Sequence, residues 1–307
     1  MTSTVADGVG TQRRKRALAK RRTASAVMTW LVCSAGIVAV VPLLLILGHI
    51  AVRGFSAMSA TFLVRLPAPA GVAGGGMGNA IAGTLILLAI ASVVGLPIGL
   101  GAGVYLAEHR TTRLANTVRF LADVLNGLPS IVLGVFAWQL LVRPAGHFSA
   151  LAGGVTLGVL MIPLVTRATE EMVRLVPVSL SEAALALGFS EWRTTSTVVL
   201  RTALPGIVTG ALVAMARVAG ETAPLLFTAF GNAYWSWDVR RPIAALPLQI
   251  YAYALSPFDD WRGQAWTGAL VLVFLVLAIG IMARLAIRSR QRLARGASVG
   301  RWTRVLP

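Results

Sequence analysis

Two long stretches of the chain contain no Lys, Arg, Asp or Glu. They are residues 26–50 and 79–107, and each exceeds the ~20 residues that a helix needs to cross a ~30 Å hydrocarbon core. Charged residues make up only 13% of the 307 residues, whereas soluble domains typically carry about 25%. The chain is therefore predicted to be an integral membrane protein rather than a soluble domain.

Six apolar runs follow one another, separated by segments that carry most of the charge. Their ranges are residues 26–50, 79–107, 118–142, 150–166, 207–230 and 263–283. Prolines interrupt five of them, which membrane helices tolerate only beside neighbouring helices or a cavity. Frequent small residues, as in GLPIGLGAGVYLAEH, permit close helix packing. The sequence predicts an all-α polytopic membrane helix bundle of six transmembrane helices. Its parts are a basic tail (1–25), a first helix (26–50), a five-helix core (75–285) and a second basic tail (286–307).

The placement of basic residues predicts how these helices are oriented. If the N-terminus is cytoplasmic, 21 of the 28 Lys and Arg residues lie inside, six lie outside, and Arg217 lies within a span. Because cytoplasmic loops are enriched in Lys and Arg, both termini are expected in the cytoplasm. The formal net charge of +17 is then assigned to topology and membrane lipid headgroups, and no nucleic-acid partner is expected.

The stretch ARVAGETAPLL (residues 216–226) places costly residues in the fifth run. A charge at the centre of a span costs about 2.5–3.5 kcal/mol on insertion scales. Arg217 and Glu221 are four residues apart, so on a helix they share one face and can pair. One interpretation is an ion pair that locks this helix to its neighbours. The other is a polar face along a substrate path, where Arg217 would bind an oxyanion such as phosphate through its planar fork.

Residues 167–204 form the longest segment on the predicted cytoplasmic side and are expected to form short helices. Ser179 and Glu182 match a capping box, which predicts the start of a helix at Ser179. Gly188 suits the end of that helix, because helices commonly end on a left-handed glycine. A helix of about two turns is not stable alone in water. It is expected either to pack on the inner face of this protein or to dock into another subunit.

The same segment contains EAALALG at residues 182–188, followed by VVL at residues 198–200. This pattern resembles the EAA loop of ABC-importer permeases. The matching residues are Glu182, Ala183, Ala184, Gly188, Val198 and Leu200. The closing proline of the pattern falls at Arg201, which is a departure from the pattern at the end of the second helix of the loop. The resemblance implies a coupling loop that inserts into an ATP-binding subunit and transmits its closure to the membrane helices.

A broader resemblance covers about residues 77–285. LNGLPSIVLGVF, IPLVTRATEEMVRLVP and GETAPLLFTA are similar to segments of phosphate-importer permeases of the PstA type, in a prokaryotic inner (plasma) membrane. The run GETAP favours this type over the paralogous PstC type. The resemblance implies a type I ABC-importer permease (MetI-like) fold and a substrate pathway at Arg217, Glu221, Thr222 and Arg167. It also implies three kinds of protein partner: a PstC-type permease, two copies of a PstB-type ATP-binding subunit, and a PstS-type extracytoplasmic phosphate-binding protein.

Other polar residues have simpler interpretations. Arg167 can equally be an arginine at the membrane interface, with Glu170 and Glu171 as exposed acids beside it. Asp123 and Asn126 are expected to form hydrogen-bonded structure. The three histidines lie near different boundaries and form no metal set, and the single cysteine excludes an internal disulfide.

The chain lacks the motif G-x-x-x-x-G-K-[ST]. ATP and Mg²⁺ are therefore expected on a partner subunit, with no cofactor on this chain. The leading interpretation is a non-catalytic permease subunit that forms half of the pathway of an ATP-driven phosphate importer. A permease for another oxyanion or an amino acid, or the PstC-type permease, is the alternative. A membrane enzyme acting on a phosphorylated lipid would need a nucleophile or metal cluster on the same leaflet, and the sequence offers none.

Overall fold

The computed structural model describes most of the chain, in two units that are treated separately, Met1–Val52 and Arg53–Pro307. The described backbone covers residues 3–56, 58–72 and 74–302, and the described side chains cover residues 21–56, 58–72 and 74–285. The predicted basic tails at residues 1–25 and 286–307 therefore lie partly outside the described residues.

Helix α1 (Ser3–Ser56) makes up the first unit, and its last residues, from Arg53 onward, belong to the second. Pro42 lies inside this helix without ending it. From Arg21 to Ser56, α1 is long and apolar enough to cross a membrane. It contains the whole of the first predicted span.

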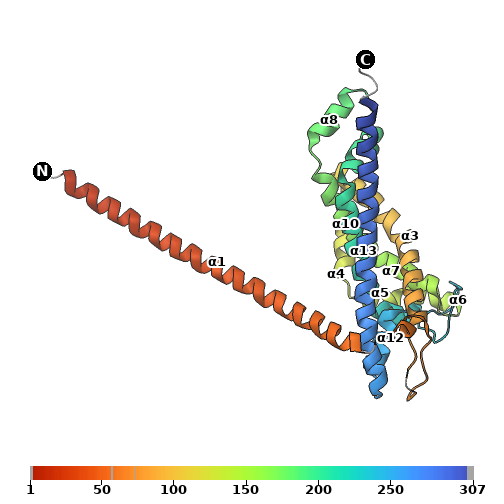
Figure 1. The fold of residues 1–307 in the computed structure, drawn as a ribbon. Helices are drawn as coiled ribbons and strands as arrows, with labels where there is room; N and C mark the ends of the chain where they lie inside the picture. The colour runs from red at the N-terminus through yellow and green to blue at the C-terminus, as the bar shows by residue number, and fades with distance from the viewer. Residues whose placement is uncertain (1–2, 57, 73, 303–307) are drawn as a thin grey trace. The chain divides into compact units, whose positions relative to one another are not determined.

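The second unit is a bundle of helices joined by loops (Figure 1). Its elements are α2 (Ala60–Val64), α3 (Gly78–Glu108), α4 (Arg113–Gly127), α5 (Ser130–Ala137), the π-helix η1 (Trp138–Val142), α6 (Arg143–Ala145), α7 (Ala150–Arg174), α8 (Val178–Ala186), α9 (Glu191–Thr194), the π-helix η2 (Thr195–Val199), α10 (Leu200–Ala219), α11 (Ala223–Thr228), α12 (Leu246–Ala254) and α13 (Asp259–Trp302). Across the described residues, β-structure is limited to two isolated bridges. The predicted all-α fold is confirmed.

The contact between α3 and α7 forms the centre of the bundle. Glycines make it possible: a Cβ atom on Gly103 would lie 2.5 Å from Cβ of Thr169, and one on Gly99 would lie 2.7 Å from Cβ of Val165. Membrane helices associate through small residues because these allow the backbones to approach and make van der Waals contacts. The close packing predicted from the small residues is therefore present.

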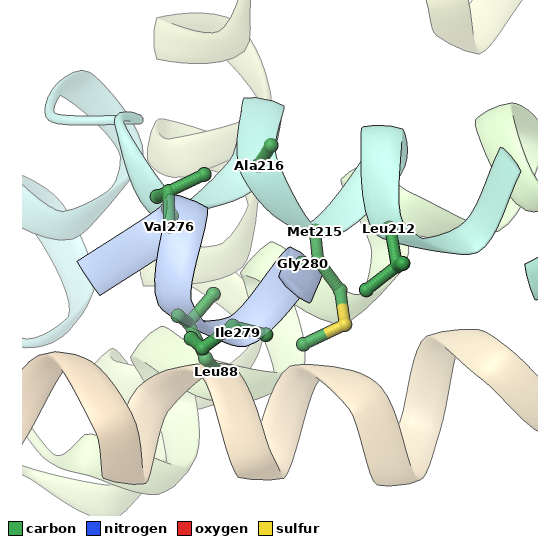
Figure 2. Close-up of a pocket in the computed structure, with 8 residues that line it drawn as sticks. Leu88, Leu212, Met215, Ala216, Val276, Ile279 and Gly280 are labelled. Atoms are coloured by element: carbon green, nitrogen blue, oxygen red, sulfur yellow. The ribbon is translucent and has the colours of Figure 1, made fainter. Parts of the chain in front are cut away.

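Helix α10 packs against α3, α7 and α13. Figure 2 shows the small apolar pocket among α10, α3 and α13. Its lining residues are Leu212, Met215, Ala216 and Ala219 of α10, Leu88 of α3, and Val276, Ile279 and Gly280 of α13. Consecutive residues on a helix point about 100° apart. Since Ala216 faces this pocket, Arg217 projects from a different side of α10.

The bundle has two ends, which we call the α8 end and the α12 end; Figure 1 shows these helices far apart. At the α12 end, the backbone N–H of Ser149 donates to the carbonyl of Thr228, and that of Ala150 donates to Arg241, both at 3.0 Å. These bonds fix the start of α7 to the last residue of α11 and to the segment between α11 and α12. The other end of α7 leads into α8.

The third predicted span, residues 118–142, is not one helix. Helix α4 ends at Gly127, Leu128 and Pro129 are extended, and the chain bends by 102° before α5 continues. Proline lacks a backbone donor and disfavours the helical conformation of the residue before it, which explains the break. The pieces lead from the α8 end back to the start of α7 at the α12 end. We therefore count them as one broken span, which with five continuous helices gives six.

The fifth predicted span, residues 207–230, is also broken. A continuous helix runs from Glu191 through α9, η2 and α10 and ends at Ala219. Gly220, Glu221 and Thr222 separate it from α11. Pro224 cannot continue α10, because its ring would clash with the carbonyl four residues earlier and it has no N–H to donate. The expectation that Arg217 and Glu221 share one helix face is therefore wrong.

Candidate functional site

The two helix breaks meet at one cavity of about 200 Å³, which we call the break cavity. Asn126 and Ser130 lie on either side of the first break; Arg217 lies just before the second break, and Glu221 lies within it. The remaining lining residues are Leu125, Leu128, Pro129, Leu160, Leu164 and Val218. The cavity thus has a polar part supplied by the breaks and an apolar part supplied largely by the helices around them.

A glycine brings the two breaks together. Helix α5 packs against α11, and a Cβ atom on Gly134 would lie 2.6 Å from Cα of Pro224. No other residue fits there unless the backbone moves, because real Cβ atoms do not approach this closely. The Gly134–Pro224 contact therefore positions the break cavity.

Arg217 and Glu221 both line the break cavity, but they do not pair with each other. Within the described part of the chain, neither side chain has a hydrogen bond or an ion pair. The ion-pair lock considered from the sequence is therefore not formed. Arg217 also borders a second cavity of about 490 Å³ between α7 and α10, together with Glu171 and Thr209. Arg217, like Leu164, thus lines both cavities.

The other two residues of the predicted pathway lie elsewhere. Thr222 precedes α11 as its N-cap residue and is outside the lining of the break cavity. Arg167, on α7, lines neither cavity. Instead, its guanidinium donates to the carboxylate of Asp123 on α4, with Nη2 2.6 Å from Oδ1 and 2.7 Å from Oδ2. Of the predicted pathway residues, the structure brings only Arg217 and Glu221 together.

Arg167 belongs to an ion-pair cluster centred on Glu170. The carboxylate of Glu170 is buried, with only 1% of the residue exposed. This carboxylate forms ion pairs with three arginines, at N···O distances of 2.8 Å for Arg119, 2.6 Å for Arg174 and 3.4 Å for Arg167. Asp123 also forms an ion pair with Arg167. We call these five residues, Glu170, Arg119, Arg167, Arg174 and Asp123, the ion-pair cluster. The expectation that Glu170 is an exposed acid is wrong, whereas its neighbour Glu171 is exposed.

The cluster connects three helices near the α8 end. Arg119 lies on α4, and its Nη2 also donates to the carbonyl of Leu106 on α3 at 2.8 Å. Glu170 and Arg174 lie on α7, which continues toward α8. The spacing of Arg167, Glu170 and Arg174 by three and four residues is the helical spacing of neighbours on one face. The sequence therefore could have shown that Arg167 and Arg174 lie beside Glu170. It could not have shown that Arg119, on another helix, is the third arginine that pairs with Glu170.

Helix α8 carries the first half of the resemblance to the EAA loop. It begins at Val178 with Pro177 in the N-cap position and no side-chain cap. The predicted capping box is therefore wrong: Ser179 already lies in the first turn, because Pro177 starts the helix earlier. Gly188 does end the helix in the left-handed region, at φ +84°. The backbone N–H of Gly188 donates to Leu185, and that of Phe189 to Ala184, at 2.9 and 3.2 Å, which is a Schellman ending.

The coupling-loop residues fall into an exposed and an anchored group. Glu182 and Ala183 are exposed on α8, whereas Ala184 is buried. Val198 lies in η2 and Leu200 begins α10, inside a helix that passes Arg201 without a break. Arg201, which stands where the EAA pattern has a proline, thus lies inside a continuous helix.

A side-chain hydrogen bond ties this helix to α3. The hydroxyl of Thr195 in η2 donates to the carboxylate of Glu108 at the end of α3. The loop between α7 and α10 is thereby attached to the helix at the centre of the bundle.

Several large apolar side chains of the loop are exposed. Leu187 and Trp192 are 79% and 78% exposed, and Leu185 is exposed as well. Exposed apolar groups gathered in this way mark protein or membrane contact surfaces. The loop therefore offers a contact surface at the α8 end.

Six candidate spans, together with the broken helices around a polar cavity and the helical loop at one end of the second unit, define the class of membrane transport permeases. Residues 99–292 match the family described as "Binding-protein-dependent transport system inner membrane component". The chain belongs to this family, and it is thus a multi-pass inner-membrane protein of transport permease type.

Individual relatives agree. The chain is 47% identical to the phosphate transport system permease protein PstA of Yersinia pestis, over 76% of this chain and 79% of that one. It is 45% identical to the protein of the same name in Haemophilus influenzae, over 76% and 83%. Among solved structures, the methionine ABC transporter MetNI in inward-facing conformations matches with a TM-score of 0.56 and 23% identity, over 69% of this chain and 96% of that one. This last likeness confirms the predicted fold.

Proposed function

We propose that this chain is one of two permease subunits of an ATP-driven ABC importer for inorganic phosphate, and that it has no catalytic activity of its own. One observation carries the proposal: Arg217 and Glu221 line a cavity at two breaks in membrane helices, and neither has a partner among the residues whose side chains are described. Relatives at 45–47% identity that are named phosphate transport permeases support the choice of substrate.

The chemistry of the two side chains suits phosphate. The guanidinium of Arg217 presents several N–H donors in a plane that matches two oxygens of a tetrahedral oxyanion. Hydrogen phosphate also carries an O–H group, which needs an acceptor, and an ionised carboxylate such as Glu221 only accepts. Because Arg217 borders both cavities, it can hold the anion while the anion moves from one cavity to the other. Thr222 and Arg167 belong to the proposed pathway through their resemblance to family positions rather than through this cavity.

The coupling loop gives this subunit its proposed connection to ATP hydrolysis. The exposed Leu185, Leu187 and Trp192 form a surface that a PstB-type ATPase would cover. ATP and Mg²⁺ would be bound there, since this sequence has no P-loop motif. A movement of α8 would reach α3 through the bond between Thr195 and Glu108. A PstC-type permease would complete the pathway, and a PstS-type protein would deliver phosphate from outside.

The same proposal fixes the orientation of the bundle. The α8 end would face the cytoplasm and the α12 end the outside, with both termini cytoplasmic. The excess of basic residues on that side supports this orientation. Labelling of single cysteines introduced on either side, in a Cys33→Ser background, would measure it directly.

Reconstitution tests the function. The chain is purified with its partner permease, ATPase and binding protein and placed in lipid vesicles. Phosphate-loaded binding protein is expected to stimulate ATP hydrolysis and ATP-dependent uptake of radioactive phosphate. A complex that assembles and hydrolyses ATP but takes up sulfate or an amino acid instead would contradict the assignment of phosphate.

A further inference from the structure

The break between α4 and α5 supplies two polar side chains that the proposed function does not yet use. Asn126 is the residue before the last of α4, and Ser130 is the first residue of α5. Both line the break cavity. Neither side chain has a hydrogen-bond partner among the described residues. The expectation that Asn126 forms hydrogen-bonded structure is therefore not met within this chain, whereas Asp123 does meet it.

The position of these residues explains why a polar ligand is needed. A broken membrane helix leaves backbone and side-chain polar groups that lipid cannot satisfy, so breaks occur beside protein or a water-filled cavity. In transporters, discontinuous helices near the middle of the membrane build substrate sites. Here two breaks from different spans face one cavity, and the contact of Gly134 with Pro224 holds them together. The first break thus contributes to the cavity as directly as the second.

We propose that Asn126 and Ser130, together with Arg217 and Glu221, form one transient binding site for a protonated tetrahedral oxyanion. This inference rests on the proposed function and extends it to two specific residues. The amide of Asn126 offers two N–H donors, the hydroxyl of Ser130 offers one, and Arg217 offers its fork, while Glu221 is the acceptor. Hydrogen phosphate has oxygens that accept and one O–H that donates, so the set matches its hydrogen-bonding groups.

Uptake by the complete importer tests this assignment. Phosphate uptake in vesicles is measured per assembled complex, at saturating phosphate-loaded binding protein. Asn126→Ala and Ser130→Ala each remove donors to a charged ligand, and each is expected to lower the rate of uptake about tenfold or more. Asn126→Asp has nearly the same size but adds a carboxylate beside Glu221, and it is expected to lower the rate further because it repels the anion.

The form of the defect separates ligand contact from a structural role. The apparent KM for the loaded binding protein is expected to stay unchanged, because docking takes place outside this cavity, while kcat falls. Two matched controls remove the same chemical groups elsewhere: Gln139→Ala, whose amide borders an apolar groove at η1 and α5, and Ser92→Ala on α3. Both are expected to keep uptake within about twofold of the unaltered importer.

The outcomes decide between the alternatives. The proposed site would be overturned if Asn126→Asp kept uptake within about twofold of the normal rate. It would also be overturned if every variant lost uptake only in proportion to a lower yield of assembled complex. If Asn126→Ala does not assemble, the nearly isosteric Asn126→Asp still decides the question. Failure of the unaltered importer to take up phosphate would overturn the proposed function and this inference with it. Normal uptake by the unaltered importer and by all variants would overturn this inference alone.

Discussion

The ion-pair cluster and the break cavity both contain arginine and carboxylate side chains, but these side chains are paired in the cluster and unpaired, among the described residues, in the cavity. In the cluster, three arginines converge on the buried Glu170, and Arg167 also binds Asp123. In the break cavity, Arg217 and Glu221 line the same space, and neither has a partner among the described residues. Both regions place charge in membrane-spanning segments, where charges are costly and usually functional.

The difference follows from how each region is built. The cluster lies on continuous helices, where spacings of three and four residues hold Arg167, Glu170 and Arg174 side by side. The cavity lies at two breaks, where the chain leaves the helix between Arg217 and Glu221. Paired charges join helices to one another, whereas unpaired charges beside a cavity are free to bind an anion. Pairing, rather than the presence of charge, separates the structural region from the candidate site.

Removing Glu170, the centre of the cluster, is expected to have the largest effect on stability. Glu170→Gln removes the buried carboxylate that three partly exposed arginines share, and breaking a buried pair costs up to about 3–5 kcal/mol. We expect a fall of this size in the free energy of unfolding, measured by denaturant unfolding of the purified protein in detergent. Glu171→Gln, at the exposed neighbour, is expected to change it by less than about 0.5 kcal/mol. Equal losses in the two variants would contradict the central role of Glu170.

Removing a charge from the break cavity is expected to lower phosphate uptake rather than stability. Arg217→Gln removes a charge that has no partner in the described part of the chain, so the stability of the chain is expected to stay nearly unchanged. Uptake of phosphate by the assembled importer is expected to fall about a hundredfold or more, because a preorganised charged donor to the anion is lost. Arg143→Gln, at an exposed arginine on α6, provides the control. Normal uptake with Arg217→Gln would remove Arg217 from the pathway.

The walls of the cavity can be tested separately from its charges. Gly134→Ala places a Cβ atom 2.6 Å from Cα of Pro224, and overpacking of this kind costs about 1–3 kcal/mol. We expect both lower stability and slower uptake, because α5 and α11 must move apart. At Gly127, beside the same break, an added Cβ meets nothing within 4 Å. Gly127→Ala is therefore the matched control, and equal losses in the two variants would argue against the close contact.

The outermost pair of the cluster should matter least. The side chains of Asp123 and Arg167 are 55% and 36% exposed, and exposed pairs contribute about 0.2–1 kcal/mol. Asp123→Asn is expected to lower the free energy of unfolding by this amount, with the difference shrinking as salt is added. A loss comparable to that of Glu170→Gln would show that the cluster acts as one unit rather than as a buried centre with a weaker edge.

Much of the fold was predictable because the membrane imposes a strong rule on composition. Residues 79–107 had to form a membrane-crossing helix, and α3 covers them almost to the residue. Gly188 was predictable as a helix end, because a left-handed residue is usually glycine. The likeness of the EAA loop to known coupling loops was readable as well, since it depends on adjacent residues. In each case the signal is local in the chain.

The failures have a common cause. Pro129 and Pro224 were visible in the sequence, but their positions alone did not show whether each would kink a helix or break it. Pro42, Pro97 and Pro163 lie inside helices that continue past them. The burial of Glu170 depends on Arg119, which is 51 residues away along the chain. Such pairings are set by which helices pack together, and no local pattern records that.

The sequence by itself determined that this chain crosses a membrane repeatedly, that it carries an EAA-like loop, and that Arg217 and Glu221 are costly enough to need a reason. These conclusions rest on the cost of burying charge in lipid and on short motifs, both of which are properties of neighbouring residues. The packing of the helices places Arg217 and Glu221 in the lining of a cavity that Asn126 and Ser130 also line, without partners among the described residues, while Arg167 is held by Asp123 and Glu170. The physical reason is that pairing depends on distances between helices, and the packing of glycines such as Gly134 and Gly103 sets those distances.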